Sequence, residues 1–373
     1  MRAFVSELRA RTDRMLEDLA TLVAIDSPSE DVAATARCVR AAAELGRELL
    51  GVAPEEVVVD GHTHLRWTFG SEPKVALLGH LDTVWPLGTS ERWPFHVKDG
   101  IASGPGCFDM KGGVVQLLHA ASVVEDRSGL TILLTTDEEI GSPSSRALIE
   151  SSVAGARAAL VCEPSADGAL KTERKGASRY RITILGRAAH AGLDPEKGAN
   201  ATHEAAHATM SIAELGDAGQ GTTVTPTLLR SGTSVNTVPA QADLFVDVRA
   251  RSTGEQERVE EALKAMQPVI PGTSLHIERL GMTPPLPRES SAGLFEVASR
   301  IAEELGLPAL TEAAVGGASD GNFTAAMGVP TLDGLGAVGG GAHAEGEYLV
   351  VGDLSARAAL VAALATEILE EAA

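Results

Sequence analysis

Apolar residues near the start of the chain recur at the spacing of one helix face. Val5, Leu8, Met15, Leu19 and Leu22 follow this spacing, and charged residues fill the positions between them. The pattern ends at the polar, proline-containing segment 26–29. It predicts one amphipathic helix over the first two dozen residues.

Short, continuous apolar runs then alternate with longer stretches of helical pattern. A run without polar alternation is typical of a strand that is buried on both faces. Strands of this kind separated by helices predict an α/β fold, with a mostly parallel sheet flanked by helices. Ligands of such sheets bind beyond the carboxyl ends of the strands. The predicted strands span residues 74–79, 130–136 and 158–162, and a predicted helix spans residues 111–124.

The pattern changes between about residues 177 and 282, where two helices separate four strands in the order β-α-β-β-α-β. This order is the split βαβ, or ferredoxin-like, signature. A chain of 373 residues also exceeds the ~250–300 residues at which one core stops growing. We therefore expect an inserted domain with hinges near Gly176 and Pro284. The expected parts are 1–176, the first part of one domain; 177–284, the insertion; and 285–373, the second part of the first domain, with helices from Ala292 and Leu354.

Composition narrows the possible partners and the compartment. The net charge of -20 repels nucleic acid and anionic membranes, and an aromatic content of 3% argues against a base-stacking surface. No apolar run is long enough to span a bilayer, and the first residues lack a signal-like apolar block. The three cysteines lack CxxC spacing, so we expect them to be reduced. We therefore expect a soluble, cytoplasmic protein.

Two adjacent glutamates, Glu138 and Glu139, end one of the predicted strands. Two like charges at this place need a nearby cation. Both side chains can reach one site only beyond the strand end, because neighbours on a regular strand face opposite ways. One glutamate could then bind a metal while the other acts as general base. A solvated acidic turn is the alternative for this motif alone.

Further potential metal ligands are distributed along the chain. His80 follows a predicted strand, and Asp82 could orient it from behind. Asp109, Glu163 and His343 add two carboxylates and a second imidazole, which are ligands that zinc prefers. Taken singly, the segment at His80 could be an ordinary strand-end turn, and Asp109 could be a helix N-cap.

The motifs HLDTV, FDMKGG, TTDEEIGS, CEP, GRAAHAG and SDGNF with GGGAH occur in this order. This set resembles the two-zinc metallopeptidase family of glutamate carboxypeptidase, aminoacylase, acetylornithine deacetylase and succinyl-diaminopimelate desuccinylase. The resemblance spans nearly the whole chain and is nearest to the glutamate carboxypeptidase branch. It implies a cis peptide bond after Asp109. It also implies the following roles: His80, Asp109 and Glu163 hold one zinc; Asp109, Glu139 and His343 hold the other; Glu138 is the general acid/base; and Asp82 orients a ligand.

A charge count is consistent with this implied centre. Two Zn²⁺ ions carry +4, three carboxylates carry -3, and a bridging hydroxide makes the cluster neutral. Co²⁺ or Mn²⁺ are candidates to replace zinc. A zinc pair lowers the pKa of bound water and polarises a carbonyl group.

The resemblance also implies that residues 1–176 and 285–373 form a catalytic zinc-binding domain and that the insertion is a lid or dimerisation domain. His190, Asn236 and Arg249 match positions that bind the transition-state oxyanion and the substrate carboxylate. We expect His190 to stabilise the oxyanion, and in dimeric relatives this histidine reaches the other subunit. Asn236 and Arg249 are expected to bind substrate, with a surface ion pair to Asp247 as the alternative for Arg249. Gly317 is expected to line the pocket through its backbone. Apart from the resemblance, Arg288 near the predicted hinge is a candidate for binding a carboxylate, with a solvated hinge charge as the alternative.

Three other interpretations remain open. The segment 203–207 reads H-E-x-x-H on a predicted helix, as in zincin metalloproteases, but it lies in the insertion. A catalytically silent binding scaffold would keep the fold and lack the metals. A nucleotide-binding protein would need a glycine-rich phosphate motif after a strand, and the sequence has none.

We therefore expect a homodimeric two-zinc hydrolase that cleaves an amide or peptide bond next to a free carboxylate. The expected substrates are small peptides or N-acyl amino acids, and the expected activity is a carboxypeptidase that releases a C-terminal residue such as glutamate. Deacylation of N-acyl amino acids is the alternative, because it uses the same residues.

Overall fold

The chain divides into two compact units in a computed structural model that describes residues 2–370. Unit 1 comprises residues 1–173, 286–315 and 319–373, and unit 2 comprises residues 174–285 with 316–318. Among residues 2–370, no helix is long and apolar enough to cross a membrane.

A six-stranded sheet forms the centre of unit 1, in the order β1-β2-β6-β3-β7-β16. The pairs β6/β3, β3/β7 and β7/β16 are parallel, whereas β1 and β2 join one edge as antiparallel strands. The sheet is thus mixed, and its parallel part contains the strands predicted from continuous apolar runs. The strands are β1 (Glu55–Val59), β2 (His62–Thr68), β3 (Val75–His80), β6 (Leu130–Thr135), β7 (Ala158–Val161) and β16 (Thr331–Leu332).

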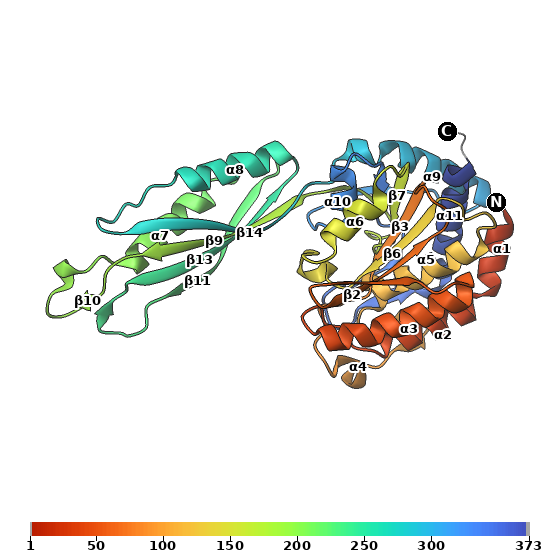
Figure 1. The fold of residues 1–373 in the computed structure, drawn as a ribbon, viewed down its shortest axis with the longest axis horizontal. Coiled ribbons are helices and arrows are strands. Elements are labelled where there is room, and N and C mark those ends of the chain that lie inside the picture. The colour runs from red at the N-terminus through yellow and green to blue at the C-terminus, as the bar shows by residue number, and fades with distance from the viewer. Residues whose placement is uncertain (1, 371–373) are drawn as a thin grey trace. The chain divides into compact units, whose positions relative to one another are not determined.

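Helices cover both faces of this sheet (Figure 1). One face packs on α2, α3, α5, α9 and α11 through a large apolar core that includes Leu77 and Ile132. The other face packs on α6 and α10 through a smaller core that includes Leu78 and Phe323. The helices are α1 (Arg2–Ala10), α2 (Thr12–Val23), α3 (Val32–Leu50), α4 (Thr89–Arg92), α5 (Gly112–Val123), α6 (Arg146–Val153), α9 (Ala292–Leu305), α10 (Asp320–Ala326) and α11 (Val351–Glu370).

The single N-terminal helix predicted from the sequence is wrong, because α1 and α2 are separated at Arg11. Arg11 has φ -100° and ψ 7°, and its backbone N–H bonds the carbonyl of Leu8 three residues back. The apolar spacing continues across this break, so the pattern alone does not reveal it. α3 matches its local signals: the Asp31 side chain accepts the N–H of Ala34, and Gly51 ends the helix with φ 77°.

Short strands complete unit 1. They lie mainly in the loops that carry site residues. One small sheet has the order β17-β18-β5-β4, and β15 pairs with β8. The strands are β4 (His96–Lys98), β5 (Ile101–Ser103), β8 (Leu170–Arg174), β15 (Glu312–Val315), β17 (Gly339–Gly340) and β18 (Tyr348–Val350).

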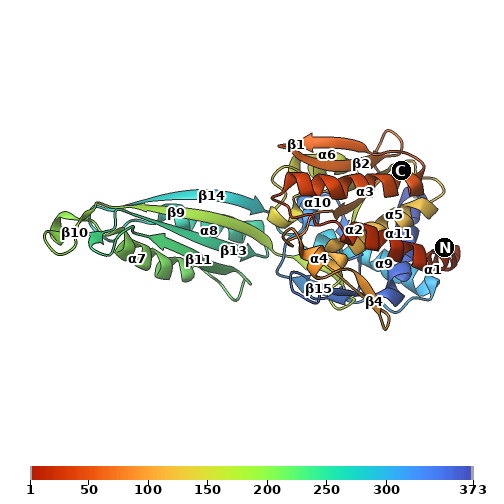
Figure 2. The ribbon, with the colours of Figure 1, turned by 90° about the horizontal axis from the view of Figure 1, so that it is seen from below.

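Unit 2 is a four-stranded antiparallel sheet in the order β11-β13-β9-β14. β13 lies between β9 and β11, so the predicted split βαβ arrangement is confirmed. Figures 1 and 2 show α7 and α8 on one face of this sheet, and their apolar side chains form a separate core with Ile182 and Val246. The elements are β9 (Gly176–Leu185), β10 (Ala189–His190), α7 (Ala201–Ala213), β11 (Thr223–Ser231), β12 (Thr237–Val238), β13 (Gln241–Ala250), α8 (Thr253–Ala265) and β14 (Ser274–Thr283).

Candidate metal centre

Three neighbouring parallel strands carry candidate residues at their carboxyl ends. His80 is the last residue of β3, Glu138 and Glu139 follow β6, and Glu163 follows β7. Because β6, β3 and β7 are adjacent and parallel, their ends meet at one edge of the sheet. Sequence positions more than 80 residues apart are thereby brought together.

Asp109 and His343 reach the same edge from loops. Asp109 precedes α5 in a segment with non-helical dihedrals, and the Asp109–Met110 peptide bond is cis, as the resemblance implies. His343 lies in the turn between β17 and β18 and has a left-handed backbone with φ 61°.

The carboxylate of Asp109 lies between the two imidazoles. Its Oδ1 is 3.4 Å from His80 Nε2, and its Oδ2 is 3.4 Å from His343 Nε2. On either side, His80 Nε2 is 3.4 Å from Glu163 Oε1, and His343 Nε2 is 3.0 Å from Glu139 Oε2. The donor atoms thus form two groups that share one aspartate.

These separations fit metal coordination. In a tetrahedral site with bonds of about 2.0–2.1 Å, neighbouring ligand atoms lie about 3.3–3.4 Å apart. Two buried atoms, His80 Nε2 and Glu139 Oε1, have no hydrogen-bond partner within residues 2–370. A buried polar atom without a partner is costly, and a bound cation would satisfy both atoms. The donor set therefore fits a pair of divalent metal ions.

Glu138 lies beside this set. Its Oε2 is 3.9 Å from His80 Nε2, so His80, Glu138 and Glu163 also form a potential three-ligand group, as do His80, Asp109 and Glu139. The distance is longer than the 3.4 Å separations of the other carboxylates from the histidines. This difference favours Glu138 as the carboxylate that remains free of the metals.

Asp82 is fully buried behind the centre. His80 Nδ1 lies 3.0 Å from the main-chain oxygen of Asp82 and 3.4 Å from its carboxylate. The carboxylate itself accepts the backbone N–H groups of Glu138 at 3.3 Å and Glu139 at 3.1 Å, as well as the hydroxyl of Ser29 at 2.6 Å. Asp82 therefore orients His80 mainly through its backbone and holds the glutamate turn through its side chain.

The electrostatics show how strongly negative the centre is. Burial lowers the pKa of His80, but Asp109, Asp82 and Glu163 outweigh it and hold that pKa well above its usual value. Contacts with Asp109 and Glu139 raise the pKa of His343 to about 10. Burial, followed by the nearby Glu163, raises the pKa of Glu138 well above its usual value. Positive charge at this position is therefore favourable.

Two further buried carboxylates support the site, and neither role was predicted from the sequence, although Asp320 lies in the SDGNF motif. Asp320 accepts the hydroxyls of Thr135 at 2.8 Å and Ser142 at 2.5 Å, on either side of the two glutamates. Burial raises its pKa to about 7. Glu347 accepts four N–H groups, including that of Asp109. The only signal for Glu347 was its place four residues after His343, just beyond the GGGAH motif.

In unit 2 the structure brings His190 and Asn236 together. The N–H of Ala191 bonds the main-chain oxygen of Asn236 at 2.9 Å, beside the pairing of β10 with β12. His190 Nδ1 accepts two backbone N–H groups at 3.1 Å, so the proton of a neutral ring lies on Nε2. Both side chains are exposed, as are Leu193 and Val235 next to them.

The predicted carboxylate-binding residues already have partners. Arg249 makes a bidentate pair with Asp247 at 2.8 and 3.0 Å, which is the alternative that the sequence left open. Arg288 pairs with Glu312 at 2.8 Å. The carbonyl of Gly317 accepts a hydrogen bond from Arg174 at 3.2 Å.

The H-E-x-x-H segment is not a metal site in this structure. His203 and His207 are exposed on α7, whereas Glu204 is buried. Its carboxylate accepts the N–H groups of Val269 and Ile270 at 2.9 and 2.6 Å. Glu204 therefore holds the loop before β14, and the two histidines lie on the surface of the helix.

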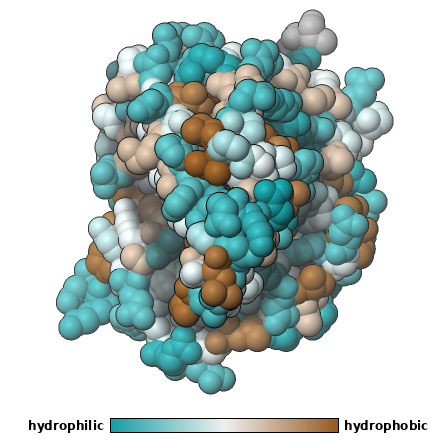
Figure 3. Space-filling model, turned by 90° about the vertical axis from the view of Figure 1, so that its left-hand side faces the viewer, coloured by the Kyte–Doolittle hydropathy of each residue, from teal (hydrophilic) through white to brown (hydrophobic). Residues whose placement is uncertain are grey.

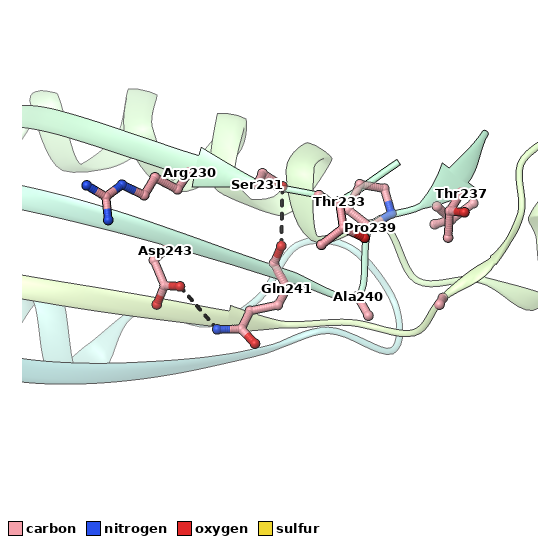
Figure 4. Close-up of a pocket in the computed structure, with 11 residues that line it drawn as sticks. Arg230, Ser231, Thr233, Thr237, Pro239, Ala240, Gln241 and Asp243 are labelled. Carbon is pink, nitrogen blue, oxygen red and sulfur yellow. Dashed lines mark hydrogen bonds between the residues drawn. The ribbon is translucent and has the colours of Figure 1, made fainter. Parts of the chain in front are cut away.

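Unit 2 also contains a shallow cavity of about 300 Å³ (Figure 4). Among its lining residues, Asp243 accepts a hydrogen bond from Gln241 at 3.1 Å and Ser231 bonds the main-chain oxygen of Gln241. Arg181 and Thr183 also bond Asp243. The Asp243 carboxylate already has hydrogen-bond partners, so we assign this cavity no chemistry.

The face shown in Figure 3 is mainly hydrophilic with separate apolar spots.

Comparison with known proteins gives a consistent result. Residues 76–367 match the profile of the family described as Peptidase family M20/M25/M40. Carboxypeptidase G2 from Pseudomonas sp. (strain RS-16) is 30% identical over 299 residues, which cover 77% of this chain and 72% of that protein. Succinyl-diaminopimelate desuccinylase from Stenotrophomonas maltophilia is 29% identical over 318 residues, with coverage of 76% and 81%.

Solved structures show the same fold. The aminopeptidase PepT from Bacillus cereus superimposes with a TM-score of 0.76 at 24% identity, over 96% of this chain and 99% of that one. An M20 family metallo-carboxypeptidase from Sulfolobus solfataricus superimposes with a TM-score of 0.73 at 17% identity, over 95% and 99%. At these identities the likeness concerns the fold alone.

Proposed function

The chain belongs to peptidase family M20/M25/M40, a family of metal-dependent hydrolases, and from this premise we propose that it is a two-zinc carboxypeptidase. The bond it cleaves is an amide or peptide bond next to a free carboxylate. The family membership makes the chain a hydrolase of peptides or acyl amino acids. The metal identity, the metal number and the carboxypeptidase activity are the proposed part.

The observation that carries the proposal is the shared aspartate. Asp109 presents one oxygen to His80 and the other to His343, each at 3.4 Å. In this arrangement His80, Asp109 and Glu163 would hold one zinc, and Asp109, Glu139 and His343 the other. When bound, a zinc pair lowers the pKa of water and polarises the scissile carbonyl.

Glu138 acts as the general acid/base in this proposal. It takes a proton from the attacking water and delivers it to the leaving nitrogen. Burial, followed by the nearby Glu163, raises the pKa of Glu138 above its usual value. Asp82 fixes the backbone of the turn that carries Glu138.

Residues of the insertion supply the remaining roles. His190, with the Nε2 proton, is proposed to bind the oxyanion, either in its own subunit or in a second subunit of a homodimer, and Asn236 is proposed to bind substrate. Their exposed apolar neighbours Leu193 and Val235 are consistent with a surface that is covered during function. We propose residues 177–284 as the lid and dimerisation domain, which closes about hinges near Gly176 and Pro284.

Arg249, Arg288 and Gly317 are proposed to receive the free carboxylate of the substrate. For Arg249 this requires release from Asp247, and for Arg288 release from Glu312. We also propose a cytoplasmic location, which the three free cysteines support, because thiols persist in reducing compartments.

Deacylation of N-acyl amino acids is the second candidate. Carboxypeptidase G2 and the desuccinylase have almost equal identity to this chain, at 30% and 29%. A catalytically silent binding scaffold is a third candidate function and is not an enzyme. It is disfavoured because the implied ligands and the implied general base are all present.

A substrate panel tests the proposal. The zinc-loaded protein is incubated with N-acyl amino acids and with peptides that end in glutamate or aspartate, and free amino acids are measured by liquid chromatography. We expect the protein to release glutamate from substrates in which a large acyl group is attached to it, and to leave acetylornithine intact. Preferential release of small acyl groups would select the deacylase instead. A protein without turnover and without about two equivalents of zinc would be a scaffold.

A further inference from the structure

Glu347 is a buried carboxylate for which the proposed reaction has no role. Its side chain is 0% exposed, and both oxygens are fully used. Oε1 accepts the N–H of Phe108 at 2.9 Å and of Asp109 at 2.8 Å. Oε2 accepts the N–H of Gly106 at 2.9 Å and the indole N–H of Trp85 at 2.9 Å.

We propose that Glu347 is a positioning residue, which sets the shared carboxylate of Asp109 and the imidazole of His343 for binding the two metal ions. It rests on the proposed function, since it assigns Glu347 a part in forming that same centre. The positioning role depends on hydrogen bonds within the chain and requires no contact between Glu347 and substrate.

Glu347 connects three segments that carry ligands. Trp85 lies in the loop after His80, and residues 106–109 form the loop that ends in the shared aspartate. Glu347 itself ends the turn that begins with His343, and its N–H bonds the carbonyl of Ala344 at 3.1 Å. A displacement of Glu347 would therefore move ligands of both proposed metal positions together.

Only a carboxylate fits this position. All four partners are donors, and each oxygen takes two of them. An amide of the same size has one acceptor oxygen, so its NH₂ group would face two N–H donors. Buried donors without an acceptor destabilise the local arrangement, and here that arrangement is the backbone of Asp109.

The main chain of Glu347 is held independently of its carboxylate. The hydroxyl of Ser103 donates to the main-chain oxygen of Glu347 at 2.7 Å, and the Cys107 thiol contacts the same oxygen at 3.7 Å. β18 follows directly and pairs with β5. A Glu347→Gln substitution therefore leaves the turn anchored, and we expect the variant to fold.

The first test measures metal affinity without substrate. Zinc is removed from the wild type and from Glu347→Gln by a competing chelator, and the bound metal is counted at each chelator concentration. Positioning residues behind ligands typically change metal affinity 10–100-fold, so we expect a loss in that range. Glu345→Gln is the matched control, because Glu345 is exposed in the same turn and the charge change is identical. It should bind zinc like the wild type.

A second readout separates positioning from a general loss of stability. With saturating Co²⁺, the visible absorption band reports the ligand geometry. We expect the band of Glu347→Gln to differ from that of the wild type, and that of Glu345→Gln to match it. With substrate at saturating metal, kcat should fall while KM changes less than about twofold, because the altered group contacts ligands and not substrate.

If Glu347→Gln fails to fold, Trp85→Phe gives the answer. It removes one of the four donors and retains an aromatic ring against Trp93. We expect Trp85→Phe to lose zinc affinity relative to the wild type, and to lose more than the Glu345→Gln control. Wild-type affinity and an unchanged Co²⁺ band in Trp85→Phe and in any folded Glu347→Gln would overturn the inference. An inactive wild type that binds two metals would instead refute the proposed reaction and leave this inference standing.

Discussion

At the scale of single residues, the site depends on which atoms face each other, and the sequence reveals this only in part. His80, Asp109 and His343 were found because histidine and carboxylate side chains follow apolar strands or occur in motifs. Glu347 was not found, because three of its four partners are backbone N–H groups about 240 residues away. No side-chain pattern reports such partners. Arg249 shows the converse, since its ion pair with Asp247 was an open alternative.

Glu138 and Glu139 should differ in their effects when each is replaced by glutamine. Glu138→Gln should retain both metal equivalents and lose about 10²–10⁴-fold in turnover, the usual contribution of a general base. Glu139→Gln should lose activity and also weaken one metal position, because its Oε2 is 3.0 Å from His343. Metal analysis with steady-state kinetics measures both. Wild-type turnover in Glu138→Gln would exclude its proposed role.

His119 should make stability depend on pH. It is fully buried, with Nε2 2.8 Å from Asp18, and burial lowers its pKa below the ordinary 6.5, although Asp18 opposes this. Below pH 6.5 the His119 side chain binds a proton in the unfolded chain, whereas burial opposes this protonation in the folded chain. Stability is therefore complete above pH 6.5 and falls as the pH drops, by at most about 1.4 kcal/mol per pH unit for one proton.

Urea unfolding between pH 5 and 8 checks this dependence. His119→Gln should show a shallower decline than the wild type, whereas His96→Gln, at an exposed histidine, should keep the wild-type slope. Parallel slopes in all three proteins would rule out His119 as the source.

At the scale of elements, buried strands were the most predictable feature. The runs at 74–79, 130–136 and 158–162 became β3, β6 and β7, because strands covered on both faces must be apolar throughout. The antiparallel strands β1 and β2 were not predicted. β1 lies at the sheet edge with mixed burial, so its residues lack a continuous apolar run. The break at Arg11 was missed for a similar reason, since both helices share one apolar spacing.

Gly46 should be essential for the packing of α3 on β2. A Cβ at this position would lie 2.3 Å from a ring carbon of Trp67, which is 2% exposed and held by a hydrogen bond to Val52. Alanine gains up to about 1 kcal/mol in helix propensity. Overpacking a rigid core costs about 1–3 kcal/mol, so we expect net destabilisation.

Denaturant unfolding of Gly46→Ala measures this effect. Gly293→Ala is the control, because Gly293 is also helical in unit 1 and a Cβ there meets no atom within 4 Å. Gly293→Ala should leave the free energy of unfolding unchanged or raise it slightly. Equal effects at both positions would show that Trp67 does not restrict α3.

At the scale of the whole molecule, the two units have separate apolar cores: unit 1 has one on each face of the mixed sheet, and unit 2 has one beneath α7 and α8. The change in pattern near residue 177 indicated an insertion, and the second unit begins at Arg174. Its inclusion of residues 316–318 was not foreseeable. A hydrogen bond from Arg174 to the carbonyl of Gly317 links these residues to the start of the unit, although the two residues are 143 positions apart in the sequence.

Metal removal should therefore lower the thermal stability of one unit only. The proposed ligands all belong to unit 1, and a metal that binds only the folded state stabilises it by about 2.7 kcal/mol at a hundredfold excess over its Kd. In scanning calorimetry we expect a chelator to lower the transition of unit 1 and leave that of unit 2 in place. His80→Ala should respond less to added zinc. A chelator effect on the second transition alone would locate the metal in the insertion.

The shared aspartate is tested most directly by anomalous scattering from crystals of the zinc-loaded protein. Data on either side of the zinc absorption edge locate each ion without reference to activity. We predict two peaks at full occupancy, one among His80, Asp109 and Glu163, and the other among Asp109, Glu139 and His343. A single peak, or peaks at other side chains such as His203 and His207, would contradict the account.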